Sequence, residues 1–210
     1  MAFFDPIVIG FCGPKRHGKN TAAAALTPLG FHDEAFAKPV KEICALAMHE
    51  SVSLYYDDVA KEEPSETYPE DTRRKIMQEV GTDLFRNRWP DIWVRNWTRR
   101  IEQGTHSLFT CTDLRFHNEA TAIMMMRNHM ILRIIDPRKD DPSDLHESEM
   151  HYRALPVDDE IQNDGTIDAL HTKVLEIVLA RWEFLAWGPP SSCGQHTVTQ
   201  RFRHDIPNIG

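Results

Sequence analysis

Hydrophobic residues recur along the chain with two spacings, and together these predict strands that alternate with helices. Short apolar runs predict strands at 7–12, 30–36, 107–112 and 130–135. Apolar residues three and four positions apart predict helices at 38–50, 71–85, 90–102, 117–128 and 167–186. Elements in this order predict an α/β fold, in which a parallel sheet is flanked by helices and joined by right-handed crossovers.

Three polar stretches interrupt this alternation. Residues 52–70 are acidic and contain two prolines, so we expect a mobile insert there. Residues 136–160 are charged and contain three prolines, which is more typical of a lid than of a core element. Residues 188–210 predict an extended or flexible tail, which leaves 1–187 as a single domain.

The bulk composition narrows the kinds of ligand. A chain of 210 residues with 41% hydrophobic residues can bury one substantial core. Its net charge of -8 argues against binding to polymeric nucleic acid, which requires a basic face. A small anionic substrate remains compatible, because Lys15, Arg16 and Lys19 form a local cationic cluster.

The cysteines and the N-terminus indicate the compartment. The four cysteines are far apart and form no Cys-x-x-Cys pair, which argues against disulfides or a zinc site. No basic segment precedes an apolar N-terminal run, and no run reaches membrane-spanning length. We therefore expect a soluble cytoplasmic protein with no membrane partner. The sequence leaves the oligomeric state open, and a homodimer is one of the alternatives.

The turn after the first strand has the pattern of a phosphate-binding loop. Gly13 and Gly18 flank four residues, Lys19 follows at once, and an alanine-rich helix begins there. The glycines let backbone N–H groups converge on phosphate oxygens, while the lysine and the helix dipole add positive charge. Asn20 stands where the metal-binding hydroxyl usually follows the lysine. Either Asn20 or Thr21 could reach the metal shell, and we favour Thr21, since Gly-Lys-x-Thr is typical of nucleoside monophosphate kinases.

An acidic and a basic residue follow the third predicted strand. Asp113 stands at the carboxyl end of this strand, where a phosphate-loop fold places the carboxylate that organises Mg²⁺ or its waters. Asp113 could equally cap the following helix. Arg115 favours the ligand-binding alternative, because an acid and a cation beside a phosphate loop are costly without ligands.

Residues between the second and third predicted strands are candidates for binding a second nucleotide. Gly81 lies inside a helical pattern, which suggests that something approaches its backbone closely. Gln78 can pair with a base edge, and Arg86 can fork onto a phosphate. Trp93 is expected in the core, with a base-stacking wall as the alternative.

The second half of the chain offers three weaker signals. Arg138 and Lys139, at the start of the predicted lid, could close over ATP phosphates. The segment 146–149, His-Glu-Ser-Glu, could bind a metal, although a hydrogen-bonding hinge is the commoner role of such a segment. Asn163 precedes the last predicted helix, where an Asx turn and an N-cap would explain it.

Taken together, these motifs resemble those of the phage deoxynucleoside monophosphate kinases. The resemblance spans residues 7–180, and its motifs lie at 18–21, 36–41, 78–86, 113–120, 146–149 and 163–166. Gln-x2-Gly-Thr-x3-Arg and Asp-x-Arg-Phe-x-Asn-Glu are the most specific of them. The resemblance implies a P-loop fold with a helical acceptor-binding region at 38–103 and a small lid at 136–160. It also implies transfer of the ATP γ-phosphoryl group to a deoxynucleoside monophosphate, for phage DNA synthesis in the host cytoplasm.

The resemblance further implies roles for single residues. ATP is expected to contact Gly13, Lys15, Arg16, His17, Gly18, Lys19, Asn20, Thr21, Arg138 and Asn163, the last near the adenine. The deoxynucleotide is expected to contact Lys41, Arg74, Gln78, Thr82, Arg86, Trp93 and Arg115. Lys19, Asp113 and Arg115 are the expected catalytic residues, and Thr21 and Asp113 the expected Mg²⁺ ligands. Asn20 and Phe85 depart from the family's usual residues. This leaves open which base is preferred, and a nucleotide with a modified pyrimidine is one of the alternatives.

Two other functions stay open at this point. A P-loop kinase that acts on a hydroxyl group of a modified nucleotide, of a base or of dephospho-coenzyme A would need a carboxylate base, and Asp33 or Glu34 could serve. A nucleotide-binding regulator that hydrolyses ATP slowly would be marked by the loss of Arg86, Arg115 or the lid cations, and all of these are present.

Overall fold

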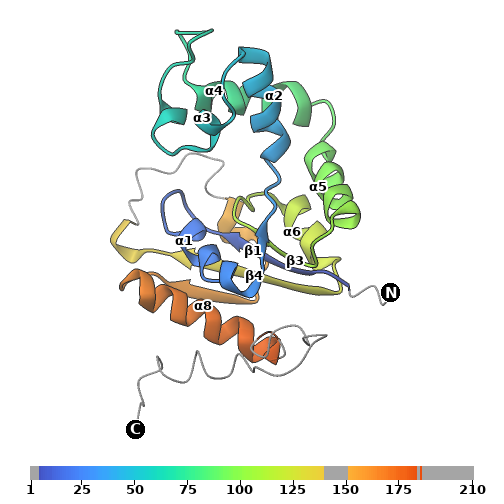
Figure 1. Cartoon of the computed structure of the whole chain (residues 1–210), viewed down its shortest axis with the longest axis vertical. Helices are drawn as coiled ribbons and strands as arrows, with labels where there is room; N and C mark the ends of the chain where they lie inside the picture. Colours follow the sequence, from blue (N-terminus) through green and yellow to red (C-terminus); the bar gives the residue numbers. More distant parts are fainter. Residues whose placement is uncertain (1–4, 140–150, 184, 186–210) are drawn as a thin grey trace, which may run out of the picture.

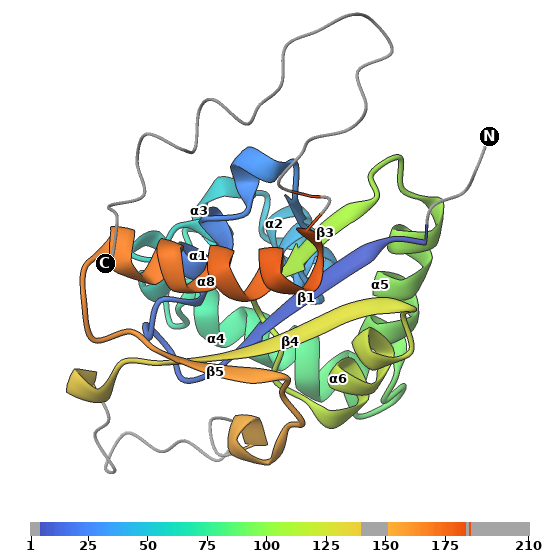
Figure 2. The same cartoon turned by 90° about the horizontal axis from the view of Figure 1, so that it is seen from below.

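Five parallel strands form one sheet at the centre of the molecule (Figures 1 and 2). The computed structural model describes residues 5–139, 151–183 and 185. The strands are β1 (Ile7–Cys12), β2 (His32–Asp33), β3 (Leu108–Cys111), β4 (Asn128–Ile135) and β5 (Asp159–Gln162). They lie in the order β2-β3-β1-β4-β5, and every pairing is parallel. The predicted parallel α/β sheet is therefore confirmed.

The strand order brings the carboxyl ends of β1, β3 and β4 side by side at one edge of the sheet. From the central strand β1 the chain passes to β2 at one edge, returns through β3, and then crosses to β4 on the other side. Gly10 of β1 pairs with Cys111 of β3 and with Ile131 of β4. Parallel strands end at the same edge of a sheet, and α/β proteins bind ligands there, where the strand order reverses.

Helices cover both faces of the sheet. The bounds are α1 (Lys19–Ala24), α5 (Ile92–Gln103), α6 (His117–Met124) and α8 (Ile167–Arg181). Side chains of β1 alternate between the two faces, as a strand requires: Ile7 and Phe11 pack with α1 and α8, whereas Val8 and Cys12 pack with α5 and α6. Within the described residues, no helix combines the length and the hydropathy that crossing a membrane requires.

Between β2 and β3 the chain builds a helical region over the carboxyl edge of the sheet (Figure 1). Before α5 it contains α2 (Lys38–Met48), α3 (Ser53–Tyr56), η2 (Ala60–Glu62), α4 (Arg73–Gln78) and η3 (Glu79–Arg86). The segment η3 is π-helical, a conformation that is frequent at functional sites. Val40, Tyr55 and Trp93 belong to a separate hydrophobic core of this region.

The stretch 52–70, which the sequence predicted to be a mobile insert, is folded around one buried carboxylate. Glu50 is 2% exposed and pairs with Arg73, which is 4% exposed, at 2.9 Å. The same carboxylate accepts hydrogen bonds from the Tyr55 hydroxyl, the Ser65 hydroxyl and the Glu66 backbone N–H. Because a buried charge is costly without such partners, this cluster fixes the segment between residues 50 and 73.

The predicted lid is only partly described. Its first residues form η4 (Pro137–Lys139), and its last described residues form η6 (His151–Ala154) and the start of β5. Residues 159 and 160, counted in the expected lid, thus belong to the sheet instead. The sequence did not reveal β5 because Ile161 is its only apolar and its only buried residue. The segment 146–149 and the predicted tail at 188–210 lie outside the described residues.

Candidate active site

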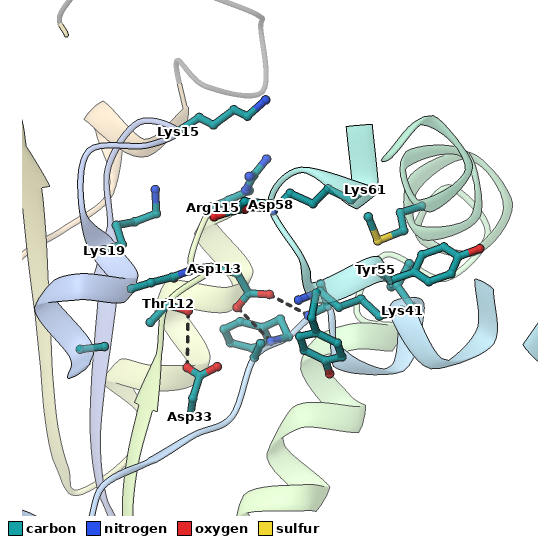
Figure 3. A pocket seen from close by; sticks show the side chains of 18 of the residues that line it. Lys15, Lys19, Asp33, Lys41, Tyr55, Asp58, Lys61, Thr112, Asp113 and Arg115 are labelled. Atoms are coloured by element: carbon teal, nitrogen blue, oxygen red, sulfur yellow. Dashed lines mark hydrogen bonds and ion pairs between the residues drawn. The ribbon is translucent and has the colours of Figure 1, made fainter. Parts of the chain in front are cut away.

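A cavity of about 810 Å³ opens at the carboxyl edge of the sheet. Its walls come from the loop after β1 with α1, from the ends of β2 and β3, and from the helical region (Figure 3). Of the residues predicted from sequence, those that line it are Lys15, Arg16, Gly18, Lys19, Asn20, Thr21, Lys41, Arg74, Gln78, Thr82, Arg86, Trp93, Asp113 and Arg115. Gly13, His17, Arg138 and Asn163 do not line it.

The loop after β1 depends on two glycines in the left-handed region. Gly13 has a φ of 131°, and a Cβ there would lie 2.3 Å from a carbonyl oxygen of β4. Gly18 has a φ of 98°, and its Cβ would lie 2.5 Å from Asn163 Nδ2. Side chains are therefore excluded at both positions. Lys19 begins α1, and its Nζ donates to the carbonyl oxygens of Gly13 (2.8 Å) and Pro14 (2.6 Å), which holds the ammonium group over the loop.

Two of the residues expected to bind ATP support this loop instead of lining the cavity. His17 is buried, and its Nδ1 accepts a 2.9 Å hydrogen bond from the backbone N–H of Asp136. Asn163 donates from Nδ2 to the carbonyl oxygen of His17 at 3.0 Å. These contacts attach the loop to the ends of β4 and β5. A contact between Asn163 and adenine stays a prediction.

Arg138 and Lys139 are anchored beside the loop. Arg138 donates to the buried Asp136 carboxylate from Nε at 2.8 Å and from a terminal nitrogen at 3.0 Å. Lys139 donates from Nζ to the carbonyl oxygen of Arg16 at 2.8 Å. The hydrogen bonds from Arg138 hold the pKa of Asp136 well below its usual range despite burial. Closure of Arg138 over a phosphate would have to break this pair.

Asp113 contacts the two residues that precede α2 (Figure 3). Its Oδ1 accepts a hydrogen bond from the backbone N–H of Phe36 at 3.0 Å, and its Oδ2 accepts one from Ala37 at 2.8 Å. It therefore caps α2 and not α6, the helix that follows it, because Glu119 accepts the backbone hydrogen bonds before α6. The Cys111 thiol also donates to Oδ1, at 3.3 Å. A carboxylate offers about four lone-pair sites, so Asp113 keeps one, on Oδ2, for a metal or a metal-bound water.

Arg115 adds a cation to the wall of the cavity. Its half-buried side chain lines the cavity, and Figure 3 shows it between Lys15 and Lys61, which belong to opposite walls. Within the described part of the chain, its guanidinium makes no hydrogen bond or ion pair. Partial burial of an unpaired cation is costly, so this arrangement favours an anionic ligand.

Asp33, at the end of β2, lines the cavity too, although the sequence indicated it only for the hydroxyl-kinase alternative. Thr112 donates a hydrogen bond to it at 3.4 Å (Figure 3). The side chain is open to water in the cavity, yet desolvation by the surrounding walls, helped by Asp113, raises the pKa of Asp33 to about 6. Desolvation lowers the pKa of Lys41, whose Nζ lies 3.8 Å from the centroid of the Tyr56 ring.

Trp93 is a core residue with one edge on the cavity. It is 4% exposed, and its Nε1 donates to the carbonyl oxygen of Gly81 at 2.8 Å. A Cβ on Gly81 would lie 3.3 Å from Cγ1 of Val40. The close approach predicted from this glycine is confirmed, and its partners are α2 and α5. Gln78 and Thr82 are exposed on the same wall, and their side chains make no hydrogen bond within the described residues.

One carboxylate links the phosphate loop to the helical wall. Glu62 Oε1 accepts hydrogen bonds from Lys15 Nζ at 2.8 Å and from Arg74 Nε at 2.7 Å. Both cations line the cavity, from opposite sides. The sequence gives no sign of this bridge, since Glu62 and Lys15 are 47 residues apart in the chain.

Arg86 lies at the end of η3 with its guanidinium on the cavity wall. One terminal nitrogen donates to Glu119 Oε1 at 2.7 Å, and the guanidinium carbon lies 3.9 Å from the centroid of the Phe116 ring. An arginine has five N–H donors, so this one retains donors for a phosphate. Its role as a phosphate ligand stays a prediction, and Glu119 is a partner that the sequence did not reveal.

The cavity is cationic even though the whole chain is acidic. Its lining cations are Lys15, Arg16, Lys19, Lys41, Lys61, Arg74, Arg86 and Arg115. Its lining carboxylates, counted like the cations within the described residues alone, are Asp33, Asp58, Asp113 and Glu119. The excess of cations suits ligands that carry several phosphate charges. Among the described residues, no three His, Cys, Asp or Glu side chains gather to hold a metal.

Fold and cavity together define a kinase of the P-loop class, in which a glycine-framed loop after the central strand faces a second cationic wall. The sequence model of the deoxynucleotide monophosphate kinase family matches residues 62–174. A protein of Acanthamoeba polyphaga mimivirus that is described as a deoxynucleotide monophosphate kinase is 31% identical over 187 residues, which are 82% of this chain and 96% of the relative. The chain belongs to the deoxynucleotide monophosphate kinase family. It is a phosphotransferase that phosphorylates a deoxynucleoside monophosphate.

Solved structures offer more distant similarities. TT1252 from Thermus thermophilus is 20% identical, with a TM-score of 0.48 over 85% of this chain and 98% of that chain. Shikimate kinase from Aquifex aeolicus is 12% identical, with a TM-score of 0.49 over 84% of this chain and 99% of that chain. Similarities this slight carry no argument about substrate.

Proposed function

We propose that the donor is ATP and that the two walls of the cavity hold the two nucleotides. ATP phosphates bind at Gly13–Thr21, and the deoxynucleoside monophosphate binds against α2, α4 and η3. The observation that carries this proposal is the position of Arg115. Its guanidinium, which has no hydrogen-bond or ion-pair partner among the described residues, lies between a phosphate loop and a second cationic wall that face the same cavity.

The reaction needs no general base in this arrangement. The acceptor phosphate has a second pKa of about 6 and is mostly ionised at neutral pH. Transfer then depends on in-line positioning and on cations that stabilise the charge moving between donor and acceptor. Lys19 supplies one such cation from the loop, and Arg115 supplies another from the end of β3.

The residues present suit Mg²⁺. This ion prefers one or two carboxylates together with phosphate oxygens and water, and does not require a protein cage. Thr21 and Asp113 would hold it or its waters, since both line the cavity and Oδ2 of Asp113 keeps one lone pair. When bound, the ion neutralises negative charge on the phosphates.

The helical wall supplies the acceptor site. Gln78 and Thr82 bind the base edge, since both residues are exposed and line the cavity. Arg86, Arg74 and Lys41 face the acceptor phosphate. Trp93 contributes an aromatic residue to this wall.

The test is ADP release from ATP with a panel of acceptors: the four standard deoxynucleotides, the ribonucleotides, hydroxymethylated pyrimidine nucleotides and dephospho-coenzyme A. We expect release with at least one deoxynucleoside monophosphate. Arg86→Gln should then raise the KM for that nucleotide about tenfold or more and leave the KM for ATP nearly unchanged, because a hydrogen bond to a charged group contributes roughly 1.5–3 kcal/mol.

Two outcomes of this panel would contradict the proposal. Release with dephospho-coenzyme A or with a nucleoside hydroxyl alone, unaffected by Arg86→Gln, would assign the cavity to a hydroxyl acceptor, with Asp33 as the base. Equal weakening of both substrates by Arg86→Gln would place Arg86 at the transferred phosphoryl group instead of the acceptor.

A further inference from the structure

Glu119 connects two cations of the cavity. It lies in the first turn of α6, and its side chain is 3% exposed. Its Oε2 accepts hydrogen bonds from the backbone N–H groups of Arg115 (2.9 Å) and Phe116 (3.1 Å). Its Oε1 accepts from the guanidinium of Arg86 at 2.7 Å. One carboxylate therefore holds the backbone of one cavity cation and the side chain of another.

Glu119 and Arg86 depend on each other: Arg86 stabilises the buried charge of Glu119, and Glu119 orients the guanidinium of Arg86. Burial raises the pKa of Glu119, Asp113 adds to the rise, and Arg86 opposes it. The buried charge therefore depends on Arg86. Conversely, Glu119 and the Phe116 ring fix the direction of the Arg86 guanidinium, which still lines the cavity with its remaining donors.

A neighbouring residue joins the same two segments. Asn118 donates from Nδ2 to the carbonyl oxygen of Pro90 at 3.2 Å and to Asp91 Oδ1 at 3.0 Å. Pro90 and Asp91 belong to the turn between η3 and α5. The start of α6 is thus held at two points, by Glu119 to the end of η3 and by Asn118 to the turn that follows η3.

We propose that Glu119 is a positioning residue of the phosphoryl transfer. It sets Arg86, which binds the acceptor phosphate, at a fixed place relative to Arg115, which binds the transferred phosphoryl group. This inference rests on the proposed function. A carboxylate that merely capped α6 would leave Arg86 able to reach the acceptor, so the two roles predict different acceptor kinetics.

Glu119→Gln tests the proposal with little change of shape. Glutamine has one acceptor oxygen and an amide group that only donates, so either Arg86 or the two backbone N–H groups lose their acceptor. We expect the KM for the deoxynucleoside monophosphate to rise roughly tenfold or more. We expect the KM for ATP to stay within about twofold, because the described partners of Glu119 are Arg86, Arg115 and Phe116, none of which belongs to the phosphate loop.

Asp158→Asn is the matched control. Asp158 likewise accepts a backbone N–H, from Ile131 at 2.8 Å, and pairs with an arginine, Arg181, at 2.8 Å. It does not line the cavity. The Asp158 side chain is more exposed (33%) than that of Glu119 (3%), but it has the same two kinds of partner. This variant should lower the Tm without changing either KM, which separates the loss of a carboxylate paired with an arginine and a backbone N–H from the loss of acceptor positioning.

A double variant makes the test specific to the pair. If Glu119 acts through Arg86, then Glu119→Gln combined with Arg86→Gln should raise the acceptor KM no further than Arg86→Gln alone. If the increase in acceptor KM of the double variant equals the product of the two single increases, the two residues act independently and the proposal is wrong. If Glu119→Gln does not fold, Glu119→Asp serves, because it keeps the charge but withdraws it from Arg86 by one methylene group.

The outcomes separate this inference from the proposed function. A lowered Tm with a wild-type acceptor KM, in either Glu119 variant, would leave capping as the only role of Glu119 and overturn the inference. If Arg86→Gln raises the acceptor KM but neither Glu119 variant does, the inference alone is lost. If the wild-type protein releases no ADP with any deoxynucleoside monophosphate, the proposed function itself is lost.

Discussion

The Oδ2 atom of Asp113 accepts a 2.8 Å hydrogen bond from the backbone N–H of Ala37, 76 residues earlier in the chain. Ala37 is the N-cap residue of α2 and has no side chain that could cap the helix itself. The end of β3 therefore supplies the cap, and the helix that carries Lys41 is held to the strand end beside the phosphate loop. Asp113 thus combines a structural role with the proposed metal role.

Asp113→Asn should lower both kcat and the Tm. The asparagine oxygen can accept only one of the two backbone N–H groups cleanly, because its amide nitrogen donates. The loss of charge should also weaken the order of the metal shell. Steady-state kinetics at saturating nucleotides, together with thermal unfolding, would check this. A lower Tm with an unchanged kcat would reduce Asp113 to a helix cap.

Lys19→Ala should abolish turnover while the protein stays folded. Its ammonium group bonds the carbonyl oxygens of a surface loop, so its removal withdraws a phosphate ligand without opening the core. ADP release and circular dichroism would be measured side by side. Lys173→Ala is the control, because Lys173 also donates to a backbone carbonyl but lies on α8, away from the cavity. Near-normal turnover in folded Lys19→Ala would remove the loop from the mechanism.

Glu50→Gln should destabilise the protein at neutral pH but not in acid. Burial alone would raise the pKa of Glu50, yet the hydrogen bonds from Tyr55, Arg73, Ser65 and the Glu66 backbone outweigh it and lower the pKa from 4.5 to about 2. Such a carboxylate stabilises the fold above its ordinary pKa, and this contribution is lost as the pH falls through the lowered value. The Tm difference between variant and wild type should therefore shrink between pH 4.5 and about 2. A difference that does not change with pH would contradict the ionised pair.

Asp33→Asn should have the opposite pH dependence. The pKa of Asp33 rises from 3.8 to about 6 in the folded protein, so its contribution to stability is fully present below 3.8 and is lost as the pH rises through 6. Asparagine resembles the protonated carboxyl group. We expect the variant to melt higher than wild type at about pH 8, and to melt alike below the ordinary pKa. Equal Tm values at both pH values would show that the cavity does not desolvate Asp33.

The phosphate loop could be predicted because its signal is contiguous. Gly13, Gly18 and Lys19 lie within seven residues, and each is required by local backbone geometry or by the charge of the ligand. The strands with continuous apolar runs were predicted for the same reason. The strand β5 was not, because an edge strand with only Ile161 buried has no apolar run to detect.

The partners of the cavity residues could not be predicted from local patterns. Asp113 was assigned to a metal or to its own following helix, and its contact with α2 depends on how the strands are ordered. Asn163 was assigned to adenine or to a turn, and it bonds the phosphate loop because β5 ends beside β4. The sequence predicted a mobile stretch at 52–70 because no long run of apolar residues marks a core there. The buried partners of Glu50 are single residues, Tyr55, Ser65 and Arg73, that are far apart in the chain.

The bridge that Glu62 makes between Lys15 and Arg74 changes how a nucleotide enters the cavity. Both cations are already paired with a carboxylate, so a phosphate that binds them exchanges one anion for another and does not neutralise bare charges. Dissolved salt screens the old pair as well as the new one. The described residues alone contribute eight lysines and arginines to the cavity lining. The affinity of this protein for nucleotides should depend on ionic strength less steeply than eight unpaired cations would suggest.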